Sequence, residues 1–135
     1  MQKWGYTLLC LVAVSLPSHA KFVEVRCPNN GHSSINIKVN QESVSIIHAT
    51  ESGINNSDTS IVDEMNVKDF YSVSFHEAAM NGLVLITGDV IFQSTRNANN
   101  HGRVLYRKVT LNKVIDDYEI IDMSNESFNK CLIIR

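Results

Sequence analysis

The amino-acid sequence predicts an all-β protein, a small antiparallel β-barrel or sandwich of about eight strands. Short segments in which apolar and polar residues alternate recur through most of the chain. Clusters of Asn, Gly and Ser separate these segments at close spacing, as turns do. The chain has 135 residues, 44% of them hydrophobic, and a formal net charge of −2. These values are typical of one globular domain and do not indicate a nucleic-acid partner.

Residues 1–20 have the pattern of a secretory signal peptide. Lys3 precedes an apolar stretch at residues 7–16, and Ser18-His19-Ala20 places small residues at a cleavage site. The apolar stretch is about half of the roughly 20 residues that a membrane-spanning helix needs. We therefore expect cleavage after Ala20, which leaves residues 21–135 as a single secreted β domain. This domain is expected in the periplasm or outside the cell, without a membrane anchor.

Two cysteines, Cys27 and Cys131, remain after this cleavage. In an oxidising compartment such a pair is expected to form a disulfide. The bond requires the two Cα atoms to lie within about 7 Å of each other. The first and last strands are therefore predicted to be neighbours. No Cys-x-x-Cys motif is present, so we interpret the pair as structural rather than redox-active.

The first part of the chain predicts three strands. Apolar residues alternate with polar ones over residues 23–27 and 35–39, and Pro28-Asn29-Asn30-Gly31 between them is typical of a turn. A third alternating segment follows at residues 43–48. Residues 57–68 differ, because Ile61, Val62 and Met65 share a helical face behind candidate capping residues. One short helix is allowed there.

The second part of the chain predicts five further strands, at residues 71–75, 83–92, 103–111, 118–123 and 131–134. Asn81-Gly82 is typical of a hairpin turn, since both residues tolerate positive φ. Gly88 interrupts the strand that follows and predicts a β-bulge or a bend there. Residues 97–102 are expected to form an exposed loop.

Charges on the last two long segments suggest a hairpin. If these segments pair, oppositely charged side chains would support the register by a few tenths of a kcal/mol each. The basic set is Arg103, Arg107, Lys108 and Lys113, and the acidic set is Asp116, Asp117, Glu119 and Asp122.

No pattern in the sequence indicates catalysis, a metal ion or a cofactor. His32, His48, His76 and His101 lack the short spacings of metal ligands. His76 and Glu77 are adjacent, but neighbours on a strand point to opposite faces and cannot form a proton relay. Nucleophile elbows, phosphate-binding loops and dinucleotide fingerprints are also missing from the sequence. We therefore expect a protein that is not an enzyme.

The opening at residues 22–39 and the ending at Cys131 resemble the small periplasmic lysozyme inhibitors of bacteria. That resemblance implies an eight-stranded barrel tied by one disulfide. However, Ser52-Gly53 lacks the aromatic residue that follows it in that family, and the downstream Lys-Gly segment of the inhibitory loop is missing. No residue role is therefore transferred from the family.

These observations favour an exported, non-enzymatic binding protein of the inhibitor or immunity type, which blocks an unknown protein partner such as a toxin or a cell-wall enzyme. The loop at residues 96–103 is the first expected binding surface, and the segment 51–58 is the second. The alternative is a periplasmic carrier that holds a small apolar ligand in the barrel interior. A hydrolase is kept as a third functional class. The sequence is also compatible with a eukaryotic secreted protein. The residues expected to bind the partner are Arg96, Asn99, Asn100, His101 and Arg103.

Overall fold

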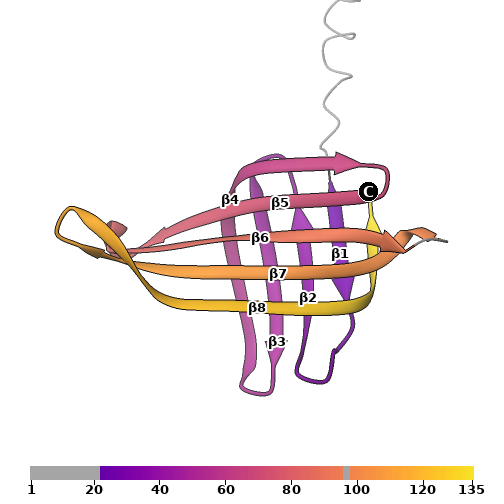
Figure 1. Cartoon of the computed structure of the whole chain (residues 1–135), viewed down its shortest axis with the longest axis horizontal. Helices are drawn as coiled ribbons and strands as arrows, with labels where there is room; N and C mark the ends of the chain where they lie inside the picture. Colours follow the sequence, from indigo (N-terminus) through magenta and orange to yellow (C-terminus); the bar gives the residue numbers. More distant parts are fainter. Residues whose placement is uncertain (1–21, 96–97) are drawn as a thin grey trace, which may run out of the picture.

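Eight antiparallel strands follow one another in sequence order around a closed barrel (Figure 1). The computed structural model describes residues 22–95 and 98–135. The predicted signal peptide lies outside the described residues. The elements are β1 (Val23–Cys27), β2 (Ser33–Val39), β3 (Ser43–Thr50), β4 (Gly53–Val67), β5 (Phe70–Ala79), the 3-10 turn η1 (Met80–Gly82), β6 (Val84–Thr95), β7 (Ala98–Val114) and β8 (Asp117–Ile134).

The barrel consists of two sheets that cross at a steep angle, and β4 and β8 belong to both (Figure 1). The N-terminal half of β4 pairs with β3, and the half that begins at Ser60 pairs with β5. The register of the β4–β5 pair shifts between Ile61 and Asp63. β8 pairs with β7 along most of its length and then with β1 at residues 132–134. Strands that bend from one sheet to the other in this way form the corners of an orthogonal barrel.

Side chains from both sheets fill the space between them. The inward positions of the strands are mostly apolar, as the alternating sequence pattern predicts, although Ser33 and Thr59 are buried polar residues. The outward positions are mostly polar. Burial of this apolar surface is the main favourable contribution to folding. The largest fully buried side chains are Tyr71, Phe75, Phe92 and Phe128.

The predicted disulfide and the predicted neighbouring strands are confirmed. Cys27 on β1 and Cys131 on β8 form a disulfide with their Cα atoms 4.3 Å apart. Within the described chain, β1 and β8 pair at three positions, namely Glu24 with Ile134, Val25 with Ile133 and Arg26 with Leu132. The bond therefore reinforces the shortest seam of the barrel.

The helix that the sequence allowed over residues 57–68 is wrong, because residues 57–67 lie in β4 and residue 68 lies in the turn that follows. Ile61 packs against the core, while Val62 and Met65 are exposed. The helical spacing of these three residues therefore does not create a buried face. Pairing with β3 on one side and β5 on the other satisfies the backbone of this segment instead.

The bulge predicted at Gly88 is also wrong. Gly88 stays in register with Phe75 on one side and with Lys108 on the other. A Cβ atom at this position would lie 2.3 Å from the Arg107 carbonyl oxygen and 2.7 Å from Cζ of Phe75. Glycine is therefore required so that the Phe75 ring can pack against the β6 backbone.

The hairpin predicted at Asn81-Gly82 is confirmed, although its turn is longer than two residues. β5 and β6 pair on either side of η1. Met80, Asn81 and Gly82 all have positive φ, at 52°, 57° and 86°. Two of the predicted strands, at residues 118–123 and 131–134, are parts of one long strand, β8.

Candidate protein-binding surface

The β7–β8 hairpin extends well beyond β1–β3 and forms a protruding arm (Figure 1). We call residues 108–125 the arm. Its tip is the turn between Val114 and Asp117, where Ile115 has a φ of 49° and a side chain that is 86% exposed. The η1 turn adds two exposed apolar side chains, Met80 and Leu83, to the surface near this end.

One edge of the arm has no strand partner among the described residues. β8 pairs with β7 on one side, whereas on its other side β1 reaches residues 132–134. All nine residues from Asp117 to Asn125 are exposed. We call this segment the β8 edge. A long edge without proline is unusual, because unpaired N–H and C=O groups can pair with another chain.

One face of the β8 edge is apolar. Tyr118, Ile120 and Met123 lie opposite Lys113, Leu111 and Val109 of β7 on the outer face of the sheet. Ile120 is 58% exposed and Met123 is 64% exposed. The row continues across β7 to β6, where Leu85 pairs with Leu111. Exposed apolar surface of this extent is typical of interaction sites.

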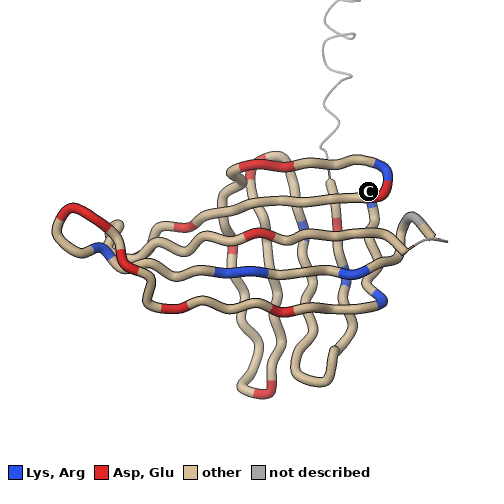
Figure 2. The backbone as a smooth tube through the Cα atoms, in the orientation of Figure 1, with Lys and Arg blue, Asp and Glu red and all other residues tan. Residues whose placement is uncertain are grey.

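The other face of the β8 edge is acidic. Asp117, Glu119 and Asp122 lie opposite Val114, Asn112 and Thr110. None of these three carboxylates forms an ion pair with a lysine or arginine in the described part of the chain. Figure 2 shows acidic residues at the tip of the arm and along β8, with one basic segment near the tip and others farther along β7.

The predicted β7–β8 hairpin is therefore confirmed, but the pairing of opposite charges across it is wrong. The register places Arg107 opposite Asn125, Lys108 opposite Ser124 and Lys113 opposite Tyr118. Arg107 binds Asp89 of β6 instead, with nitrogen–oxygen distances of 2.8 and 2.5 Å. The hydrogen bond to Asp89 raises the pKa of Arg107. Within the described chain, Asp117, Glu119 and Asp122 consequently form no ion pair with a basic residue of β7.

Glu126, the next residue of β8 beyond the β8 edge, anchors the arm to the other sheet. Its carboxylate accepts a hydrogen bond from the Ser33 hydroxyl and lies 2.8 Å from Nε2 of His48. Asn30 donates to the same carboxylate at 3.4 Å and to the Ser127 carbonyl at 3.0 Å. These contacts join β8 to β2 and β3 at the point where the arm leaves the barrel.

Tyr106 lies beside this network. Its ring meets the His48 ring edge-on, with centroids 5.7 Å apart. Burial raises the pKa of Tyr106 to about 12, and the negative charge of Glu126 contributes. The carboxylate stands between the Ser33 hydroxyl and the imidazole, so the histidine does not activate the serine as a base would. The contacts of Glu126 with Ser33 and His48 therefore hold β8 against β2 and β3.

Asn99, Asn100, His101 and Arg103, which sequence reasoning placed in the binding surface, lie at the opposite end of β7 from the arm. Arg96 and the side chain of Asn99 are outside the described part of the chain. Asn100 and His101 are exposed, with Oδ1 of Asn100 3.0 Å from Nδ1 of His101. The expected loop is wrong from Ala98 onward, because β7 begins there and pairs with Thr95.

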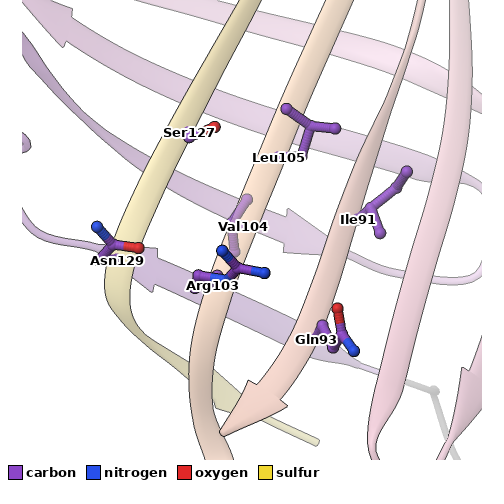
Figure 3. Close-up of a pocket in the computed structure, with 7 residues that line it drawn as sticks. All are labelled: Ile91, Gln93, Arg103, Val104, Leu105, Ser127 and Asn129. Atoms are coloured by element: carbon purple, nitrogen blue, oxygen red, sulfur yellow. The ribbon is translucent and has the colours of Figure 1, made fainter.

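Arg103 contributes to a surface pocket on the outer face of the sheet that contains β6, β7 and β8. The pocket has a volume of about 270 Å³ and opens between β6, β7 and β8 (Figure 3). Ser127 and Asn129 of β8 line one side of it, and Gln93 of β6 lines the other. Residues of three strands line this pocket. Of the predicted binding residues that the structure describes, Arg103 is the one that lines it.

Sequence reasoning missed the β8 edge and the anchor at Glu126. The anchor joins residues separated by 78 to 97 positions, so no local pattern could indicate it. The β8 edge carried a visible signal, because apolar and acidic residues alternate from Asp117 to Glu119. Their charges also fit the interpretation given above, in which the acidic residues pair across a hairpin with the basic residues of the preceding strand.

No family model, curated protein or solved structure matched the chain when it was compared with each of these sets. Among the described residues, no group of three His, Cys, Asp or Glu side chains is placed to hold a metal ion. No helix in the described ranges is long and apolar enough to cross a membrane.

Proposed function

We propose that this chain is an exported, non-enzymatic binding protein that recognises and blocks a protein partner, and that the arm is the surface it uses. The observation that carries the proposal is the β8 edge, in which nine consecutive strand residues are exposed and one backbone edge lacks a partner within the described chain. Such an edge favours association with another chain.

The remainder of the molecule supports the arm as a rigid scaffold. A buried apolar core, a closed barrel and the Cys27–Cys131 disulfide restrict motion of the strands from which the arm extends. The anchor at Glu126 holds β8 at the base of the arm. A surface held rigidly in this way loses little conformational entropy when it binds.

The shape of the arm favours a blocking role. It is a narrow projection (Figure 1), and a projection of this kind fits a concave surface such as the cleft of an enzyme. A toxin or a cell-wall enzyme offers such a cleft, and a disulfide-tied inhibitor suits the oxidising compartment in which either would be met.

A carrier of small apolar ligands is the second candidate. It would need an apolar internal cavity. Phe92 and Phe128 are fully buried in the core. A cavity of about 400 Å³ lies between β4, β5, β6 and β7, but polar side chains such as Thr59, Glu77 and Lys108 line much of it. The exposed apolar residues of the arm lie outside the barrel instead. The arrangement of apolar surface therefore favours a protein partner over a ligand inside the barrel.

Site-specific photo-crosslinking tests the proposal. A photoreactive residue replaces Met123 on the arm or, as a matched control, Val67 at the end of β4, where the side chains are 64% and 52% exposed. Each oxidised protein is incubated with periplasmic or secreted material from the producing cell. We expect one protein adduct at position 123 and none at 67, and the identified partner should lose activity when the protein is added. Identical adducts at both positions, or none at 123, would refute the proposal.

A further inference from the structure

We infer that the occupant of the β8 edge is an extended segment of the partner, with basic and apolar residues in alternation, which joins the sheet as an additional strand. The inference rests on the proposed function and specifies how the partner binds. It follows from the unpaired backbone of the β8 edge and from the separation of its side chains into an acidic and an apolar face.

The backbone of the β8 edge can pair with an added strand. β7 pairs with every residue of the β8 edge except Ile121, where the register shifts by one residue. In an antiparallel pair, residues alternate between those bonded to the neighbour and those whose N–H and C=O groups point away. About half of the backbone groups of the β8 edge are therefore directed outward, at the spacing that an added strand requires. An extended peptide would extend the sheet there through main-chain hydrogen bonds.

The acidic side chains of the β8 edge favour basic residues on one face of an added strand. On an added strand, successive side chains alternate between the two faces of the sheet. On one face they would lie beside Asp117, Glu119 and Asp122, which have no ion-pair partner among the described residues. Lysine or arginine is favoured there, because cross-strand neighbours of opposite charge stabilise a pair and like charges destabilise it.

The other face requires a different residue type. Tyr118, Ile120 and Met123 are exposed on this face and continue the apolar row that begins at Leu85 and Leu111. Apolar side chains on an added strand would extend this row and bury it. The complementary segment therefore has a period of two, with a basic residue followed by an apolar one.

The charge of the β8 edge argues against a second copy of this chain as the occupant. Pairing two such edges would place three carboxylates of each copy on adjacent strands, without a described cation to offset them. Repulsion between these groups disfavours the pairing. A basic segment gains attraction from the same groups.

The probe for the test is a synthetic nine-residue peptide in which lysine and valine alternate, used with the full oxidised protein at low ionic strength. Its control has the same composition, with all lysines at one end. We expect saturable binding of the alternating peptide, measured by isothermal titration calorimetry, and at least about tenfold weaker binding of the control. Equal affinities, or no binding at millimolar peptide, would overturn the inference.

Backbone methylation separates strand addition from simple charge attraction. Two versions of the alternating peptide carry N-methyl groups on the lysines or on the valines, and each version blocks one edge of the peptide strand. We expect one version to lose binding and the other to keep it. Similar affinities for both versions would show that main-chain pairing is not used.

Two charge variants test the acidic face. The triple substitution Asp117→Asn, Glu119→Gln and Asp122→Asn should weaken binding of the alternating peptide about tenfold and reduce its dependence on salt. The control triple substitution, Glu42→Gln, Asp63→Asn and Asp69→Asn, removes the same charge from exposed positions elsewhere and should leave the affinity unchanged. An equal loss in both variants would point to the net charge of the protein and overturn the acidic face as the recognition element.

The outcomes distinguish this inference from the proposed function. A partner that crosslinks at position 123 while the peptides fail to bind would preserve the proposed function and refute strand addition. A contrary result is elution of the protein as a dimer in size-exclusion chromatography, with tighter dimerisation of the variant Asp117→Asn, Glu119→Gln, Asp122→Asn. That result would assign the β8 edge to a second copy and overturn the inference. A monomer that binds the alternating peptide supports the inference.

Discussion

Removal of the Cys27–Cys131 disulfide should cause a large loss of stability. The bond joins residues 104 positions apart, so it restricts almost the whole described chain in the unfolded state. The chain-entropy relation assigns a stabilisation of about 4.7 kcal/mol to a loop of this size. Domains of this length have unfolding free energies of about 5–15 kcal/mol, so the bond supplies a substantial share.

The structure gives a second reason to expect a large effect. β1 and β8 pair at three described positions, while the neighbouring pair of β7 and β8 extends over most of both strands. Without the disulfide, this short seam and the contacts around Glu126 hold the end of the chain to its beginning. The loss should therefore fall at the upper end of the range measured for disulfides in small domains.

Urea denaturation of the oxidised protein and of the double variant Cys27→Ala, Cys131→Ala measures the difference, with circular dichroism as the probe. The urea dependence should also become steeper in the variant, because an unfolded chain without the bond exposes more surface. Reductant should lower the stability of the wild-type protein and leave the variant unchanged. A difference below about 1 kcal/mol would refute the reasoning, since the seam would then be stable without the bond.

Three other predictions follow from the packing and electrostatics of the barrel. Gly88→Ala should destabilise the protein by about 1–3 kcal/mol, because the new Cβ would lie 2.3 Å from a backbone oxygen; an unchanged urea midpoint would contradict this. Glu126→Gln should cost about 1–3 kcal/mol through the loss of its charged contacts with Ser33 and His48, whereas the exposed control Glu119→Gln should change stability by less than about 0.5 kcal/mol in the same melts. The pKa of Tyr106 is raised to about 12, so the folded state holds this proton more tightly than the unfolded state does. The resulting stability is present below pH of about 10 and is lost as the pH rises toward 12; Tyr106→Phe should flatten this decline by at most about 3 kcal/mol in urea melts across that range.

Much of the barrel was predictable because its strands follow a local rule. The alternation of apolar and polar residues placed Val25, Ile37 and Val73 in the core, and all three are fully buried. Residues 57–68 were misjudged because Ile61, Val62 and Met65 fit a helical spacing, and only the two neighbouring strands reveal that this segment is a corner. Gly88 was misjudged because the Phe75 ring that requires it comes from another strand.

The binding surface was less predictable. The sequence contained the acidic and apolar residues of the arm, but an alternating strand does not reveal whether its second edge is covered. That depends on where β1 ends and where β8 turns, which are properties of the closed barrel. The register also decided the charge pairing, since it placed Arg107 beside Asp89 and left the carboxylates of the arm without cations from the described chain.

The sequence by itself determined the strand class, the pairing of the two cysteines and the absence of recognised catalytic motifs, because each depends on residue type and short-range spacing. The tertiary structure decided which edge stays open, which faces carry the apolar and acidic residues, and which polar groups anchor the arm. Those features arise from contacts between residues far apart in the chain, and the register that creates them is set by the packing of the whole barrel.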